Sequence, residues 1–281
     1  MRAPATVRGI TLAEVMVAMA LGLLLALAMA TLHARVLQVS GETTRAADAQ
    51  DTLRIALAVL EYELQHAGFW GPVDAAGRIE GRRGDATPLA VPVSGDCGTD
   101  WAIDLDEALQ GWSAGWPLSC APYGGMPARG AVLVLRRAEA RATTPDAGVL
   151  QLEADPWQAR LSADGGPAAP GTTRHDLVAR AYYVSPRSTG DAGRPSLRRK
   201  TLQRGPRVVD EELVPGVAAM DLAFGIDLDP PGTPGHGLPN RFTAPELAHG
   251  PVVAVRVRLV ADDPARFELT RTIPLRNGPL P

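Results

Sequence analysis

The hydrophobic pattern of the chain begins with an apolar run from Val15 to Leu32 that contains no charged residue. Residues 10–32 are long enough for a helix that crosses a membrane, which takes about 20 residues. Glu14 is the one charged residue in this range, and a carboxylate in hydrocarbon is costly and usually functional. We therefore expect residues 10–32 to span a membrane, with Glu14 as a candidate functional residue.

A helical pattern extends beyond the apolar run, since residues 34–66 contain no proline. Leucines recur in this stretch at spacings of four, three and four residues, which places them on one helix face. They are Leu53, Leu57, Leu60 and Leu64. We expect this face to pack on a folded domain, and the side chains of Arg54, Glu61 and Glu63 to face solvent or partners. Gly68 is typical of a C-cap, so the helix should end near residues 67–68.

The rest of the chain has the pattern of a loop-rich β domain. After a loop-rich region at 72–127, strand-like runs occur at 131–135, 149–152, 177–184, 218–224, 252–260 and 267–273. In the clearest run, Val255 and Val257 alternate with Arg256 and Arg258, as in a half-buried antiparallel strand. The chain has 29 glycines and 25 prolines but only 5% aromatic residues, which favours turns over a helical bundle. We predict an α+β fold in which a long N-terminal helix packs on an antiparallel β-sheet domain with long loops.

The charge pattern bears on partners and on orientation. The net charge is −3, and no domain-wide basic excess predicts a nucleic-acid partner. We interpret one local basic cluster as a solvated loop or hairpin face, with contact to DNA or an acidic polymer as the alternative. It consists of Arg194, Arg198, Arg199, Lys200, Arg204 and Arg207. Arg2 and Arg8 precede the apolar run, so the positive-inside rule places them in the cytoplasm and most of the chain across the membrane.

Two cysteines, Cys97 and Cys120, lie in the part of the chain that we expect to be exported. In an oxidising compartment such a pair predicts one disulfide. A metal site is the alternative, but no CxxC pair and no histidine lies near these residues. Closing the loop between them should stabilise the domain by about 3 kcal/mol in the chain-entropy model.

No motif in the chain indicates catalysis or a cofactor. Residues 111–115 match the G-x-S-x-G nucleophile elbow, which needs a buried strand before it and a helix after it. Residues 107–110 do not have the pattern of such a strand, and Pro117 would interrupt the helix. The five histidines are scattered, and the acidic residues at 100–106 and 227–229 do not match an EF-hand calcium loop. We expect no catalytic residue, metal or cofactor, and we assign no role to the Arg-Gly-Asp tripeptide at 83–85.

Residues 8–14, Arg-Gly-Ile-Thr-Leu-Ala-Glu, and the apolar run after them resemble the prepilin leader and helix start of the type IV pilin and type II secretion pseudopilin superfamily. The resemblance implies that a prepilin peptidase cuts between Gly9 and Ile10 and methylates the new amino terminus of Ile10. It also implies that Glu14 pairs with the terminal amine of a neighbouring subunit. In a low-dielectric layer this pair costs less than either charge alone. Ile10 departs from the phenylalanine that is commonest at this position in the superfamily.

Three other interpretations of the N-terminus compete with this one. The first is a secretory signal with a small-residue cleavage site at 26–28 or 28–30. The second is a plain membrane anchor, and the third is a buried core helix. The first two do not explain a glutamate at this spacing from Gly9. The third conflicts with the continuous apolar surface, which lacks a polar face.

Further segments resemble PilW-like minor pilins, and they occur in the family's order along nearly the whole chain. They are residues 65–71, 181–184, 196–199, 212–217, 224–227, 255–259 and 275–277. Phe224 replaces the usual tyrosine. Pro72 stands where many of these proteins have a cysteine, so Cys97 and Cys120 must pair differently from any family bridge that uses that position.

The resemblance implies a minor pilin that takes part in type IV pilus assembly, twitching motility or attachment. The implied partners are other minor and major pilins, the prepilin peptidase and the inner-membrane assembly platform. The implied domains are a leader (1–9), a transmembrane half of the helix (10–32), a periplasmic amphipathic half (33–67) and a β-rich periplasmic domain (68–281). The protein would reside in the inner membrane and, after assembly, in the fibre. A minor pseudopilin of a type II secretion system and a membrane-anchored periplasmic binding protein are the alternatives.

Overall fold

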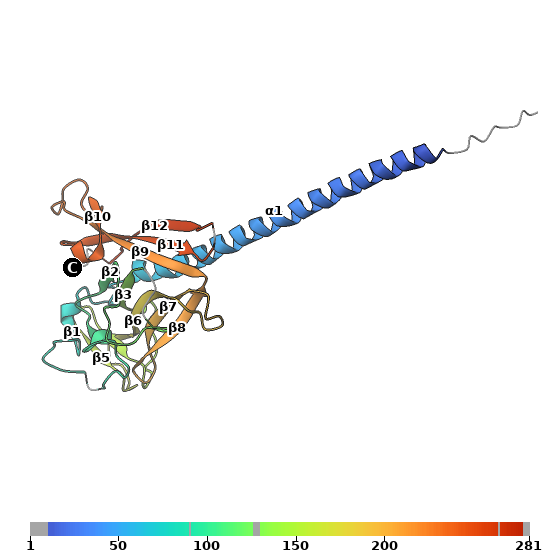
Figure 1. The fold of residues 1–281 in the computed structure, drawn as a ribbon. Coiled ribbons are helices and arrows are strands. Elements are labelled where there is room, and N and C mark those ends of the chain that lie inside the picture. The colour runs from blue at the N-terminus through green and yellow to red at the C-terminus, as the bar shows by residue number, and fades with distance from the viewer. Residues whose placement is uncertain (1–10, 90, 126–129, 264, 278–281) are drawn as a thin grey trace, which may run out of the picture. The chain divides into compact units, whose positions relative to one another are not determined.

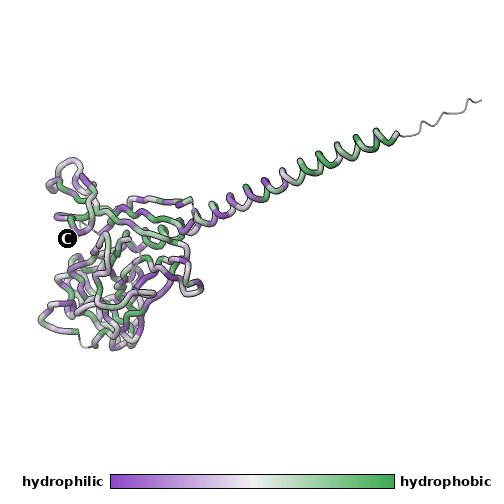
Figure 2. Tube along the Cα trace, viewed as in Figure 1, coloured by the Kyte–Doolittle hydropathy of each residue, from purple (hydrophilic) through white to green (hydrophobic). Residues whose placement is uncertain are grey.

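The computed structural model describes residues 11–89, 91–125, 130–263 and 265–277 (Figure 1). They form two compact units, one ending at Asp48 and the other beginning at Ala49. Helix α1 (Leu12–His66) runs from the first unit into the second. After Glu14 in its first turn, the part of α1 in the first unit carries a long apolar stretch, residues 15–32 (Figure 2). The predicted helix start at Ile10 lies outside the described residues.

The second unit contains the end of α1, two β-sheets and three short 3-10 helices among the described residues. The larger sheet comprises β1 (Ile79–Glu80), β2 (Leu109–Trp112), β3 (Val132–Ala138), β4 (Gln151–Ala154), β5 (Ala159–Ser162), β6 (Thr173–Ser185), β7 (Ser196–Gln203) and β8 (Arg207–Pro215). The smaller sheet comprises β9 (Val217–Ile226), β10 (Arg241–Thr243), β11 (Val252–Ala261) and β12 (Glu268–Pro274). The 3-10 helices are η1 (Ala76–Arg78), η2 (Trp101–Ile103) and η3 (Pro245–Leu247). This architecture confirms the predicted α+β fold class.

Strand β6 organises the larger sheet. Residues 173–176 of β6 pair with β4, residues 177–182 with β3, and residues 180–185 with β7. The order β1-β5-β4-β6-β3-β2 therefore runs through β6, while β7 and β8 branch from it as a hairpin. These pairs of β6 are antiparallel, whereas β1 and β5 pair in parallel. A single long strand thus connects the two parts of this sheet.

The smaller sheet is antiparallel, in the order β10-β9-β11-β12. On β11, Val255, Val257 and Leu259 are fully buried, whereas Arg256 and Arg258 are exposed. The alternation predicted for this strand is therefore confirmed. It gives the sheet one apolar face for the core and one polar face for solvent.

The end of α1 shares one hydrophobic core with both sheets. The four predicted leucines, Leu53, Leu57, Leu60 and Leu64, are each at most 2% exposed. They belong to the same cluster as Leu133 and Tyr182 of the larger sheet and Val257 and Leu259 of the smaller sheet. The packing role predicted for the leucine face is confirmed. Truncating one such leucine to alanine typically costs about 2–5 kcal/mol of stability.

The chain leaves α1 at the predicted glycine. Gly68 has a φ of 72°, in the left-handed region that glycine adopts at least cost. Its N–H donates to the carbonyl oxygen of Arg136 at 3.0 Å. The side-chain amide of Asn277 donates to the carbonyl oxygens of Gln65 and Ala67, at 3.5 and 3.1 Å. Asn277, from far along the chain, therefore satisfies carbonyl groups that the helix end leaves without partners, while the carbonyl oxygen of Arg136 accepts the N–H of Gly68.

Glu63 does not face solvent or a partner, so that expectation was wrong. The residue is 3% exposed, and its carboxylate accepts hydrogen bonds from Nε and Nη2 of Arg137 at 3.1 and 3.3 Å. Arg180 also pairs with it. Burial lowers the pKa of Arg137, but the hydrogen bonds and charge of Glu63 raise it above its ordinary value. The helical period could not reveal this environment because the two arginines lie on β3 and β6.

Each of the six predicted strand runs overlaps a strand, namely β3, β4, β6, β9, β11 and β12, although the run at 149–152 shares only residues 151–152 with β4. The hydrophobic pattern missed the β7–β8 hairpin, because its two strands are rich in charged residues that pair across the hairpin. It also missed β2, which begins at Leu109 within the stretch that had not been recognised as a strand. This strand is short and its last three residues are half-buried, so its apolar signal is weak.

We expect Glu63→Ala to lower the free energy of unfolding by about 3–5 kcal/mol, because the buried Arg137 would lose its bidentate partner and keep only Glu139 as an acidic partner. Urea unfolding of the detergent-solubilised protein, followed by tryptophan fluorescence, would measure this loss. Glu61→Ala is the matched control, since Glu61 pairs with Arg271 at 2.9 Å in a more exposed position. The control should lose less than about 1 kcal/mol. Equal losses in the two variants would contradict the importance of the buried pair.

Candidate functional site

Glu14 lies in the first turn of α1 and caps its own helix. Its carboxylate accepts hydrogen bonds from the N–H and the hydroxyl of Thr11, at 2.9 and 3.0 Å. The N–H of Glu14 in turn donates to Oγ1 of Thr11 at 3.3 Å. This reciprocal arrangement is a capping box, which satisfies backbone donors at the start of a helix. Its signal, Thr-x-x-Glu before an apolar run, is present in the sequence at 11–14 and was missed there.

The cap gives Glu14 a local role in addition to the assembly role that the resemblance implies. A carboxylate at a helix N-terminus is stabilised by the helix dipole as well as by these hydrogen bonds. The same negative group could pair with an amine brought to it by another chain. Gly9 and Ile10, the predicted cleavage and methylation residues, lie outside the described residues.

The apolar surface of α1 is exposed over the part of the helix that precedes the second unit. In the first unit, large apolar side chains from Leu12 to Val39 are exposed, including Leu23, Leu24 and Leu25 at 63–70%. Within the described ranges, α1 is the helix long and apolar enough to span a membrane. A signal sequence near an N-terminus meets the same criterion of length and hydropathy. The helix and the β domain together are consistent with a single-pass membrane anchor.

The predicted disulfide between Cys97 and Cys120 is present, with the two Cα atoms 4.5 Å apart. It belongs to a second hydrophobic cluster, which includes Trp101 together with Val132 and Val134 of β3. These valines alternate along β3 with Leu133, whose side chain belongs to the core that contains α1. The disulfide-bonded segment therefore covers the face of the larger sheet opposite to α1.

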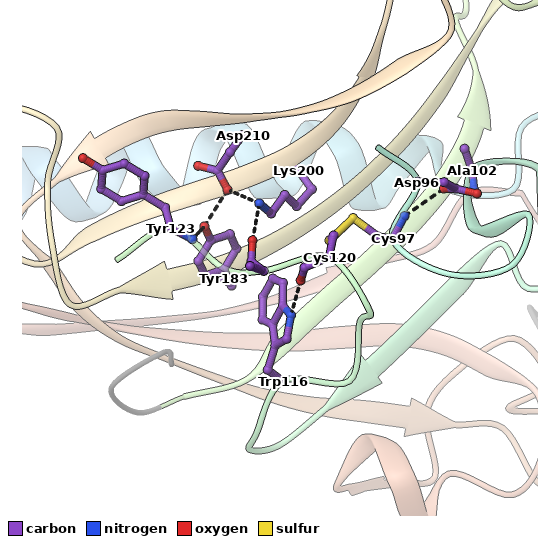
Figure 3. The surroundings of a disulfide bond; sticks show 10 residues. Asp96, Cys97, Ala102, Trp116, Cys120, Tyr123, Tyr183, Lys200 and Asp210 are labelled. Atoms are coloured by element: carbon purple, nitrogen blue, oxygen red, sulfur yellow. Dashed lines mark hydrogen bonds and ion pairs between the residues drawn. A yellow bond between two sulfur atoms is a disulfide. The ribbon is translucent and has the colours of Figure 1, made fainter. Parts of the chain in front are cut away.

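Hydrogen bonds hold the disulfide-bonded segment on the sheet (Figure 3). Nε1 of Trp116 donates to the carbonyl oxygen of Cys120 at 2.6 Å, and Nζ of Lys200 donates to that of Ala121 at 2.6 Å. The hydroxyl of Tyr183 accepts from the N–H of Tyr123 at 2.8 Å. Strands β6 and β7 therefore contribute polar contacts as well as apolar surface to this segment.

Two ionisable groups near the disulfide have shifted pKa values. Burial raises the pKa of the Tyr183 hydroxyl, and its hydrogen bond to Asp210 raises it further. Burial also raises the pKa of Asp96, although the carboxylate accepts the N–H groups of Cys97 and Ala102. Both shifts follow from the layer of side chains that excludes water from this face of the sheet.

The basic cluster lies largely on the β7–β8 hairpin, but its central residues are not solvated. Arg198 is 3% exposed and pairs with Asp210 at 2.7 Å and Glu212 at 3.0 Å. Lys200 is 8% exposed and pairs with Asp210 at 2.9 Å. The expectation of a solvated face was wrong for these two residues, because acidic residues of β8 lie across the hairpin from them. The positive charges of Arg198 and Lys200 are therefore compensated by acidic residues of the same domain.

The G-x-S-x-G stretch also has a structural environment unlike that of a nucleophile elbow. Gly111 and Trp112 end β2, and no helix follows directly in the described residues. Ser113 Oγ donates to the carboxylate of Glu246 at 2.8 Å, and Ser113 N–H also donates to that carboxylate. No group of three or more histidine, cysteine, aspartate or glutamate side chains suited to a metal ion occurs within the described ranges.

Residues 181–277 match the sequence model of the family described as Type IV Pilus-assembly protein W. The matched segment begins within β6 and continues past β12, so it includes the β7–β8 hairpin and the whole smaller sheet. No curated protein and no solved structure matches the chain. The family match supports a PilW-like family for this protein and involvement in type IV pilus assembly.

We expect replacement of Cys97 and Cys120 by serine to lower the free energy of unfolding by about 3 kcal/mol, because the unfolded chain regains loop freedom. Urea unfolding with and without dithiothreitol would measure the change. The reductant should destabilise the parent protein by a similar amount and leave the double variant unaffected. A parent protein whose stability does not respond to reduction would contradict a stabilising role for the bond.

Proposed function

We propose that this protein is a minor pilin that takes part in initiating the type IV pilus or is incorporated into its fibre. The observation that carries the proposal is the match of residues 181–277 to the pilus-assembly W family. Its support at the other end of the chain is Glu14, which stands in the first turn of an apolar helix. The protein would support twitching motility or attachment as a part of the fibre, without catalysing a reaction.

The proposed mechanism begins with removal of residues 1–9 by the prepilin peptidase and methylation of Ile10. The new terminal amine is positively charged, and Glu14 of a neighbouring subunit would pair with it. Such a pair is favoured where water is scarce, because each charge compensates the desolvation of the other. The apolar residues after Glu14 would hold the helix in the inner membrane before assembly and between neighbouring helices afterwards.

The proposed location is the inner membrane, with a single span and the β domain in the periplasm. Cys97 and Cys120 fit this location, because disulfides form and persist in the oxidising periplasm. Other minor and major pilins would contact the helix, and the inner-membrane assembly platform would receive it. In this arrangement the buried end of α1, with Glu63 and the leucine face, belongs to the β domain.

We expect the mature protein to begin at methylated Ile10 in cells that contain the prepilin peptidase and at Met1 in cells that lack it. Intact mass and N-terminal sequencing of the purified protein would measure both starts. A start near Thr31 would indicate an ordinary secretory signal, and Met1 in both strains would indicate a plain anchor. Either result would remove the basis for the assembly mechanism.

We expect both Glu14→Ala and Glu14→Gln to be processed normally and to be depleted severalfold from sheared fibres, because each removes the charge that pairs with the amine. Glutamine is the informative variant, since it can still accept the hydrogen bonds of the capping box. Immunoblotting of fibre and membrane fractions would measure the distribution. Normal incorporation of the glutamine variant, with loss only of the alanine variant, would assign Glu14 a capping role instead.

A further inference from the structure

A tight turn between β4 and β5 displays a tryptophan to solvent. Oδ1 of Asp155 accepts the N–H groups of Trp157 and Gln158, at 2.7 and 3.0 Å. Trp157 is 77% exposed, the most exposed of the described tryptophans. The turn is therefore held in shape by its own hydrogen bonds while its largest apolar side chain lies in water. An exposed indole of this kind is suited to contact with a partner.

A half-open hollow of about 150 Å³ lies beside this turn. The polar side chains that line it belong to Glu80, Glu153, Asp155, Gln158, Arg160 and Thr172. Trp157 lies between Asp155 and Gln158 in the turn, so its indole is adjacent in the chain to residues of the hollow. The parallel pairing of β1 with β5 brings Glu80 opposite Arg160. Three segments of the chain, at residues 80, 153–160 and 169–172, thus contribute to one polar hollow, and the turn that carries Trp157 belongs to the second of them.

The floor of the hollow is rigid because Glu153 is fully engaged. Its carboxylate accepts hydrogen bonds from the N–H of Ala169 at 2.7 Å, from Arg160 at 3.0 Å and from Arg174 at 2.9 Å. Thr172 Oγ1 adds a further hydrogen bond at 3.2 Å. Although burial raises its pKa, these contacts lower the pKa of Glu153 to about 2. The carboxylate therefore remains ionised and holds Arg160 at the wall of the hollow.

The lining has more acidic than basic groups, since Arg160 is its one basic side chain and pairs with Glu153. Glu80 and Asp155 remain as carboxylates at the wall, and Gln158 adds an amide that can donate and accept. An aromatic platform with such neighbours suits a pyranose ring, whose C–H face packs on an indole and whose hydroxyl groups bond to carboxylates and amides. The excess negative charge disfavours uronic and other acidic sugars.

We infer that Trp157 and the adjacent hollow bind a pyranose unit of a polysaccharide that carries no acidic groups. The indole packs on the ring, while Glu80, Asp155 and Gln158 bond to its hydroxyl or amino groups. The site lies on β1, β4 and β5, outside the segment that matches the family model. It does not depend on the assembly role of Glu14, and it would give the exposed domain a means of contact with a glycan-coated surface.

Isothermal titration of the full-length protein in detergent tests this inference with three probes: maltohexaose, a chitosan hexamer and a hexamer of galacturonic acid. The neutral and amino-sugar probes should bind, and the acidic probe should not. Trp157→Ala should weaken binding about tenfold or more, as expected for loss of a stacking contact, whereas Trp157→Phe should retain part of it. Glu80→Gln should weaken the chitosan probe more than maltohexaose, because only the former carries positive charge.

Leu247→Ala is the matched surface control, since Leu247 is 61% exposed and lies in η3, away from the residues of the hollow. It should leave the affinities unchanged, and circular dichroism should confirm that all variants are folded. The inference is overturned if none of the probes binds at millimolar concentration, if Trp157→Ala binds as tightly as the parent, or if the acidic probe binds best.

Discussion

The buried interaction of Glu63 with Arg137 and Arg180 fixes the end of α1, residues 49–66, in the second unit. Leucine contacts are not directional, so the leucine face alone would tolerate a small rotation or slide of the helix. The paired hydrogen bonds from Arg137 allow far less freedom, because a planar guanidinium must meet both carboxylate oxygens at once. Any displacement would break these paired hydrogen bonds and leave the buried carboxylate of Glu63 poorly compensated. One carboxylate thereby aligns the end of the helix with β3 and β6 of the larger sheet.

Strand β3 extends this dependence to the opposite face of the sheet. Arg137 reaches α1, whereas its neighbour Arg136 donates to the carbonyl oxygens of Trp101 at 2.7 Å and Glu107 at 2.5 Å. Burial lowers the pKa of Arg136 to about 10. Two consecutive arginines thus contact the segments that cover the two faces of the sheet. Because both faces are covered, all seven residues of β3 are buried. The helix and the disulfide-bonded segment are both positioned by this strand.

Local periodicity in the sequence predicted the leucine face of α1, the end of the helix at Gly68 and the strands with apolar runs. It failed where a charged residue is stabilised by a distant partner. Glu63 and Lys200 have solvent-compatible side chains, and only the tertiary pairing with Arg137 and Asp210 explains their burial. At the candidate site, the disulfide followed from the cysteine count and compartment, whereas the cap by Thr11 was overlooked although its four-residue signal is local. The sequence contained no indication of a binding site at Trp157, because the polar residues of the hollow come from separate segments that only the fold brings together.

The hydrogen bonds from Asn277 to the end of α1 have a consequence for the time at which the domain can fold. Gln65 and Ala67 precede Asn277 by 212 and 210 residues, so this closure requires a very long loop to form. Contacts of such separation form late and slowly, and a chain still being synthesised lacks its last strands. The core that covers the leucine face of α1 is therefore complete only after β12 and the residues that follow it have been synthesised. Because the chain is synthesised from its N-terminus, the leucine face of α1 is made well before β12. During that interval a chaperone could bind the uncovered apolar face and protect it.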